Sequence, residues 1–198
     1  MKIRFLVCHL IAILLCVAPS IGATTLARLS IDQLARAADA VARVRCISAQ
    51  SRWENGEIWT VMSFNVVETM KGALPPRITV RLPGGRVGHL NAAVDGTPRF
   101  SADDEVVVFL ERYPASLNAG SGLVRAGEFS VAAWVEGTFR IGRDPRTGIE
   151  NVTQDSSTFA VFDTATRTFH TEGIRRMPIE QFRDRVAAAI TRTQEKIQ

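Results

Sequence analysis

The feature that most constrains this chain is a pair of alternating segments joined by an asparagine–glycine turn. From Ala40 onward, small and apolar residues recur at every second position, which is the period of a strand with one buried face. A longer alternating segment runs from Ile58 to Met70. Asn55 and Gly56 lie between the two segments, and this dipeptide favours the tight turns of antiparallel hairpins. The pattern therefore predicts a long β-hairpin.

Further apolar segments predict that the rest of the chain is also mainly β. Ile78, Val80 and Leu82 alternate with polar or small neighbours, and residues 105–110 end in a continuous apolar run. Such a run indicates a strand that is buried on both faces. Weaker strands are expected at 123–126, 138–141, 149–152, 159–162 and 167–170. Residues 83–100 are expected to form a glycine-rich, irregular loop.

A helix is expected near each end of this β region. Ser30 can cap the first helix, and Gln33 completes a capping box, so a short helix should end near Asp39. The second helix is predicted over residues 178–196, because Pro178 suits a first turn and apolar residues follow at helical spacing. This order of elements predicts a single small β-barrel, OB-like and partly open, since closure removes exposed strand edges. A β-sandwich is the alternative.

Residues 1–23 have the three-part pattern of a secretory signal peptide. Lys2 and Arg4 precede an apolar segment, and small or helix-breaking residues follow it. Cleavage is expected after Ala23, with Ser20 as a second option, and a retained N-terminal anchor is the alternative. The protein is therefore expected to be secreted or periplasmic, with residues 24–198 forming one domain. The membrane would be involved only through the signal peptide, before cleavage.

Removal of the signal peptide restricts what can hold this domain together and what it can bind. Cys46 is the one cysteine that remains, so the domain has no internal disulfide and depends on its core. The formal net charge falls from +4 to +2. Arginines are dispersed among Asp and Glu along the chain, a pattern that excludes the concentrated basic patch of a nucleic-acid-binding protein.

Several short segments resemble a known group of proteins. They are residues 37–44, Trp53-Glu54, 68–72, 80–85, 98–100 and 105–110, and together they span roughly residues 30–142. They are similar to segments of a widespread group of uncharacterised secreted bacterial proteins and, more distantly, of the OB-type barrels in netrin and metalloproteinase-inhibitor modules. The resemblance implies a fold. Those inhibitors use an N-terminal cysteine and several disulfides, which the chain after residue 23 lacks, so the resemblance does not extend to metalloproteinase inhibition.

Catalytic and metal-binding signatures are missing from the sequence. The two histidines and one cysteine that follow the signal peptide are far apart, and no H-E-x-x-H or complete G-x-S-x-G motif is present. No cofactor and no metal site are therefore predicted. The acidic run from Asp103 to Glu105 is interpreted as a turn before a buried strand rather than a cation site.

The loop over residues 83–100 is the best candidate for a binding site. Gly84 and Gly85 can direct backbone N–H groups outward to form an anion-binding nest. Arg86, His89 and Arg99 add positive or switchable charge nearby, and Trp53 is the tryptophan most expected to be exposed.

The sequence therefore favours a non-enzymatic binding or interaction module outside the cytoplasm, with an anionic ligand or an envelope or extracellular protein as its partner. Two alternatives remain. One is a hydrolase that uses His89 with Asp95 or Glu105, and the other is a structural protein of the cell envelope.

Overall fold

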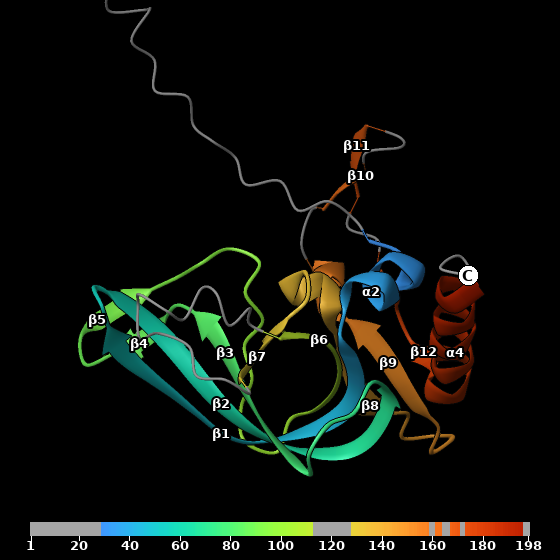
Figure 1. Cartoon of the computed structure of the whole chain (residues 1–198), viewed down its shortest axis with the longest axis horizontal. Helices are drawn as coiled ribbons and strands as arrows, with labels where there is room; N and C mark the ends of the chain where they lie inside the picture. The colour runs from blue at the N-terminus through green and yellow to red at the C-terminus, as the bar shows by residue number, and fades with distance from the viewer. Residues whose placement is uncertain (1–28, 113–127, 159–160, 164–166, 171–172, 196–198) are drawn as a thin grey trace, which may run out of the picture.

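The chain folds around a five-stranded, partly closed β-ring (Figure 1). The computed structural model describes residues 29–112, 128–158, 161–163, 167–170 and 173–195. The ring follows the order β1-β2-β3-β7-β6 and closes through pairing of β1 with β6. Its strands are β1 (Ala40–Glu54), β2 (Glu57–Lys71), β3 (Arg77–Pro83), β6 (Glu105–Arg112) and β7 (Glu128–Val131). The predicted partly open β-barrel is thus confirmed. The ring is mixed, because β3 and β7 run parallel while its other neighbouring pairs are antiparallel.

The predicted hairpin is the longest pairing in this ring. β1 and β2 pair from Val41 opposite Lys71 to Glu54 opposite Glu57. Asn55 and Gly56 both have positive φ angles, 48° and 88°, as tight hairpin turns of this class require. The outer half of the hairpin extends beyond β6, which pairs with β1 only over residues 40–45.

The remaining described strands lie beside or outside the ring. β8 (Thr138–Arg143), β9 (Glu150–Gln154) and β12 (Met177–Pro178) extend the sheet from β6. Two separate hairpins are formed by β4 (Gly85–Val87) with β5 (Leu90–Ala92) and by β10 (Val161–Asp163) with β11 (Thr168–His170). Short 3-10 helices, η2 (Trp134–Gly137) and η3 (Asp155–Thr158), precede β8 and follow β9.

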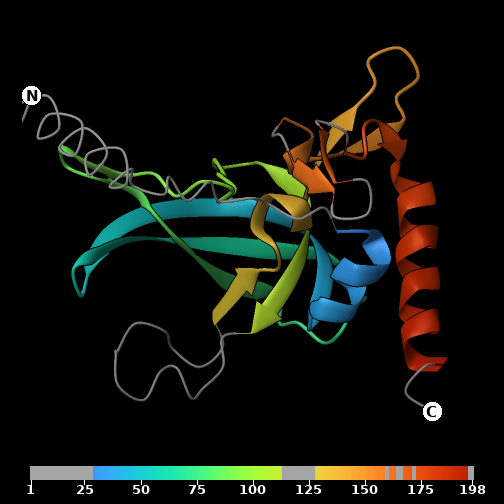
Figure 2. The same cartoon turned by 90° about the horizontal axis from the view of Figure 1, so that it is seen from above.

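Two helices pack together at the end of the molecule opposite β4 and β5 (Figures 1 and 2). They are α2 (Ile31–Ala37) and α4 (Ile179–Glu195). The Ser30–Gln33 capping box forms as predicted. Phe182 of α4 is fully buried and its ring contacts that of Phe139, with centroids 4.7 Å apart. No helix in the described part of the chain is both long and apolar enough to cross a membrane.

β6 separates two apolar cores, which explains its uninterrupted apolar sequence. Val106, Val108 and Leu110 face the core inside the ring. Val107 and Phe109 face a second core between the ring and the helices. A strand with apolar cores on both faces has no solvent-facing position that favours a polar residue.

Sequence reasoning was wrong about part of residues 83–100 and missed β7. The segment contains the β4–β5 hairpin, whose strands pair from Gly85 opposite Ala92 to Val87 opposite Leu90. Gly88 turns this hairpin with a φ of 58°, so its glycines build a hairpin rather than an irregular loop. The predicted strand at 123–126 lies outside the described residues, as do the predicted signal peptide over residues 1–23 and residue 196 of the predicted second helix.

A charge network fastens the β8–β9 extension to the ring. Arg43 of β1 bonds Glu105 of β6 and donates to both carboxylate oxygens of Glu150 at 2.8 and 3.1 Å. Arg45 also donates to Glu105, at 2.8 Å. The hydrogen bond from Arg43 holds the pKa of Glu150 below its ordinary value. Partial burial raises the pKa of Glu105, but its bonds to the two arginines outweigh burial and lower it overall.

These lowered pKa values predict a loss of stability in acid. A carboxylate with a lower pKa in the folded state contributes stability above its unfolded pKa of about 4.3, and that stability is lost as the pH falls through the folded pKa. We expect Arg43→Met to reduce the difference in unfolding free energy between pH 6 and pH 3, measured by urea denaturation. The control is Arg146→Met at an exposed turn position. An equal acid loss in the wild type and in Arg43→Met would contradict this role.

Candidate functional site

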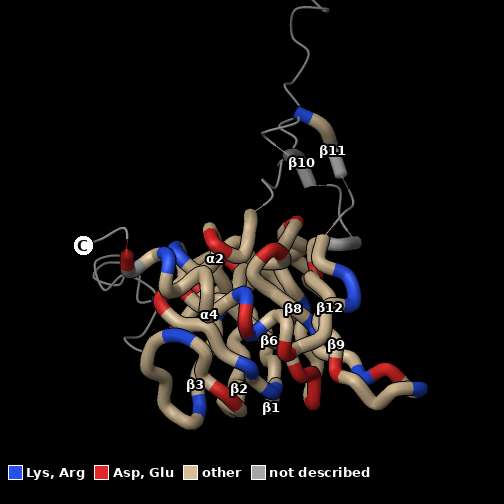
Figure 3. Tube along the Cα trace, turned by 90° about the vertical axis from the view of Figure 1, so that its right-hand side faces the viewer, with Lys and Arg blue, Asp and Glu red and all other residues tan. Residues whose placement is uncertain are grey.

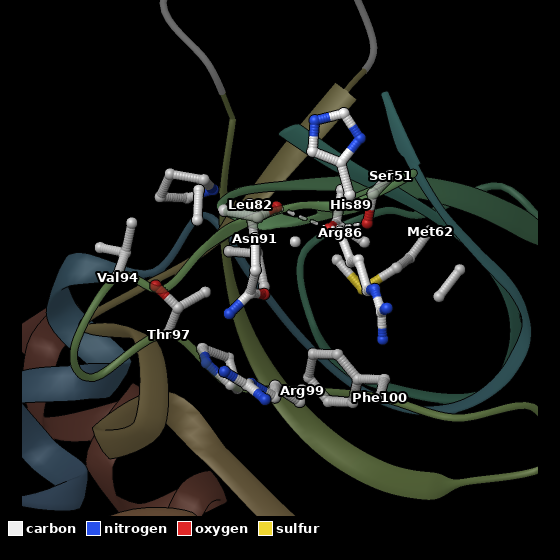
Figure 4. Close-up of a pocket in the computed structure, with 17 residues that line it drawn as sticks. Ser51, Met62, Leu82, Arg86, His89, Asn91, Val94, Thr97, Arg99 and Phe100 are labelled. Carbon is white, nitrogen blue, oxygen red and sulfur yellow. Dashed lines mark hydrogen bonds between the residues drawn. The ribbon is translucent and has the colours of Figure 1, made fainter. Parts of the chain in front are cut away.

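A hollow lies between the outer half of the β1–β2 hairpin and residues 83–100. Its volume is about 570 Å³, within the range of roughly 300–1,000 Å³ that is typical of small-molecule sites. Figure 4 shows the side chains that surround it. Strand residues of β1 and β2 form one wall, and the β4–β5 hairpin with the segment after it forms the other.

The structure brings together five of the six predicted site residues. Gly84, Gly85, Arg86, His89 and Arg99 all line this hollow. Trp53 does not line it. Trp53 lies two positions beyond Ser51 on β1, and alternate residues of a strand share a face. Trp53 therefore lies on the strand face that borders the hollow, nearer the hairpin tip, and it is 54% exposed.

Hydroxyl groups hold the glycine segment against the hairpin. The Thr60 hydroxyl donates to the Gly84 carbonyl at 2.7 Å. Because that bond uses its single proton, the Ser51 hydroxyl must be the donor in the 2.9 Å contact with Thr60. The Gly84 N–H donates to the Ile58 carbonyl at 2.8 Å. Gly84 therefore positions the segment, and its amide is already used rather than directed outward as the predicted anion nest requires.

The ionisable side chains that line the hollow are all of basic residues. Arg86, His89 and Arg99 are exposed, and the described lining contains no Asp or Glu. Arg86 Nε donates to the Gly88 carbonyl at 3.3 Å. Many other arginines of the described chain form ion pairs with carboxylates, for example Arg43, Arg140, Arg183 and Arg192. Within the described residues, neither Arg86 nor Arg99 has such a partner, so their charge remains available to a ligand.

Arg140 fixes the far end of the lining segment. Its guanidinium donates to the Arg99 carbonyl at 2.6 Å and to Asp104 at 3.0 Å. It also forms a two-point ion pair with Asp155, at 2.6 and 3.0 Å. The guanidinium lies 5.8 Å from the centroid of the Phe100 ring. The backbone of Arg99 is therefore fixed independently of its side chain.

The other sequence-based candidates do not join this site. Cys46 is fully buried, and burial raises the pKa of its thiol, with Asp104 adding to the effect. Asp103 has a φ of 69° in a turn, while Asp104 and Glu105 bond to different arginines. No group of three His, Cys, Asp or Glu side chains in the described ranges is placed to hold a metal ion. Neither Asp95 nor Glu105 lines the hollow beside His89.

Sequence reasoning missed much of the lining. Ser51, Thr60, Met62, Asn91 and Phe100 all face the hollow. The alternation of residues 58–70 is the signal that groups Thr60 with Met62, because alternate residues of a strand share a face. Asn91 and Phe100 carry no comparable signal, because their positions depend on how residues 83–100 fold back over the hairpin.

The close approach of Gly85 to the hairpin yields a stability prediction. A Cβ atom on Gly85 would lie 2.2 Å from Ser51 Oγ and 2.3 Å from Thr60 Oγ1, at a φ of 130°. A Cβ on Gly88 would contact nothing within 4 Å, at a φ of 58°. Gly88→Ala should therefore cost about 1–2 kcal/mol of backbone strain. Gly85→Ala should cost more in the same thermal-unfolding measurement, and equal losses would contradict the described packing.

The chain was also compared with known proteins. Neither the models of known protein families nor the curated proteins contain a match to its sequence. Its candidate function therefore rests on the geometry of the hollow.

Proposed function

We propose that this protein is a non-enzymatic binding module that works outside the cytoplasm and takes an anionic group at residues 83–100. The observation that supports this proposal is the convergence of Arg86, His89 and Arg99 on one hollow without a lining carboxylate. Arginine side chains with no carboxylate partner among the described residues favour binding of an opposite charge, and guanidinium groups suit carboxylates and phosphates especially well. The signal-peptide pattern of residues 1–23 supports the proposed location.

The surroundings of Arg86, His89 and Arg99 favour binding over catalysis. A general base must lie within hydrogen-bond reach of the proton that it takes. A hydrolase that uses a histidine as this base commonly orients it with a carboxylate. Among the described lining residues His89 has no carboxylate neighbour. The Ser51 hydroxyl donates its hydrogen bond to Thr60 rather than to a histidine. The lining residues therefore suit the binding of an anion better than the catalysis of hydrolysis.

A thermal-shift comparison with matched ligands tests this proposal. The panel contains acidic and neutral oligosaccharides of equal length, peptides with a free or amidated C-terminus, and phosphate. A ligand at a hundredfold excess over its Kd stabilises the folded protein by about 2.7 kcal/mol. We expect stabilisation by an acidic member but not by its neutral counterpart, and loss of that shift in Arg86→Ala/His89→Ala.

The control for this comparison is Arg146→Ala, which removes an exposed charge from the turn between β8 and β9. It should retain the full ligand-induced shift. Equal stabilisation by acidic and neutral members, or an unchanged shift in the double variant, would refute anion binding at this segment. No stabilisation by any compound would direct the search to a protein partner.

A further inference from the structure

The floor of the hollow is continuous with the core of the ring. Met62, Leu82 and Phe100 line the hollow, and the same three residues belong to the apolar core inside the barrel. Their side chains are at most 8% exposed. Val94, which also lines the hollow, is 38% exposed. A ligand that entered between Arg86 and Arg99 would therefore meet apolar surface below the charges.

The polar groups in the lining are unevenly placed and unevenly available. In Figure 4, Arg86 and Arg99 approach the hollow from different sides, and Asn91 also lines it. The Ser51 and Thr60 hydroxyls already use their protons in hydrogen bonds within the protein. An anion would therefore find its donors on the 83–100 segment, while the opposite wall offers Ala49 and Met62 as apolar contacts.

We infer that the ligand is an organic acid with an apolar body, whose acidic group lies between Arg86 and Arg99 and whose body contacts Met62, Leu82 and Phe100. This inference rests on the proposed function. A bare inorganic anion would occupy only part of a hollow of about 570 Å³ and would leave the apolar floor uncovered. The lining combines apolar residues with a few arginine, histidine and amide groups, and apolar contacts together with a few placed polar groups are what sites for organic ligands use.

A second hollow of similar size lacks the same chemistry. It lies at α2 and α4, has a volume of about 590 Å³, and is lined in part by Arg185 and Arg192. Arg192 donates to Asp32, which also lines that hollow, at 2.6 Å. A carboxylate of the protein therefore already takes up part of its positive charge. This comparison assigns the acidic ligand to the hollow beside β4 and β5.

The inference is tested by calorimetric titration of the purified protein with a graded set of probes. The set contains acetate, hexanoate, octanoate and octanamide, so that apolar length and charge vary separately. Burial of each additional methylene should tighten binding by about four-fold until the floor is covered. Octanamide should bind at least ten-fold more weakly than octanoate. Acetyl-Gly-Leu and its C-terminal amide form a second pair, which shows whether a peptide end supplies the same chemistry.

Two variants locate the charge and provide a control. Arg86→Ala/Arg99→Ala should weaken octanoate by at least ten-fold and leave octanamide unchanged, because the Arg99 carbonyl keeps its bond to Arg140. Arg192→Ala, at the second hollow, should change neither. Equal affinities of acetate and octanoate would overturn the apolar-body inference and leave anion binding intact. Equal affinities of octanoate and octanamide, both unaffected by the double variant, would overturn the proposed function as well. Absence of binding by every probe would overturn the inference.

Discussion

The rest of the structure depends on the backbone pairing of β1 with two partners at once. β1 pairs with β2 along almost its whole length but with β6 only over residues 40–45. Where β6 ends its pairing, the Cys46 amide and carbonyl bond to Asp104 and Asp103 instead. A register shift follows between Cys46 and Ser48, and such irregularities bend a strand and increase its twist. On the N-terminal side of Cys46, β6 pairs with β1 and closes the ring. On the C-terminal side, β1 no longer pairs with β6 and the ring is open.

The hollow follows from that opening. Beyond Ser48 the hairpin continues without β6, so one of its faces is left for residues 83–100 to cover. Gly85 lets the chain lie directly on Ser51 and Thr60, and Gly84 lets it pass close to the Ala92 carbonyl, where a side chain would not fit. The short β4–β5 hairpin then holds Arg86 and His89 above the apolar residues of the ring. The site is therefore the place where the barrel core reaches the surface.

Charge distribution separates this site from the rest of the surface. Figure 3 shows basic and acidic positions interleaved over the side of the molecule that carries α4, β8 and β9. There, Arg43, Arg183 and Arg192 are each paired with carboxylates across elements. These pairs join the helices and the β8–β9 extension to the ring. Arg86 and Arg99 have no ion-paired carboxylate among the described residues, and this difference is the basis for treating them as ligand-facing.

Local sequence patterns predicted the elements whose structure is set locally. The capping box of Ser30, the Asn55-Gly56 turn and the two-faced burial of β6 each depend on neighbouring residues and were predicted correctly. β7 was missed because it is only four residues long and its parallel pairing with β3 joins distant parts of the chain. The glycines of residues 83–100 indicated a special backbone but could not show that it folds into a hairpin.

The same distinction applies to the site. The sequence predicted that Arg86, His89 and Arg99 belong together because they are close along the chain. Met62 and Phe100 are placed beneath them only by the ring, which brings β2 and the segment before β6 to the same end of the barrel. The apolar character of the site could therefore be inferred only from the structure.

The most direct test of this account is an amide chemical-shift titration of the isotope-labelled protein with octanoate. The account predicts saturable shifts concentrated at Ser51, Thr60 and residues 84–100, with α2 and α4 unaffected. Shifts centred on the hollow beside Arg185 and Arg192, or spread evenly over the surface, would contradict the claim that the open end of the ring is the binding site.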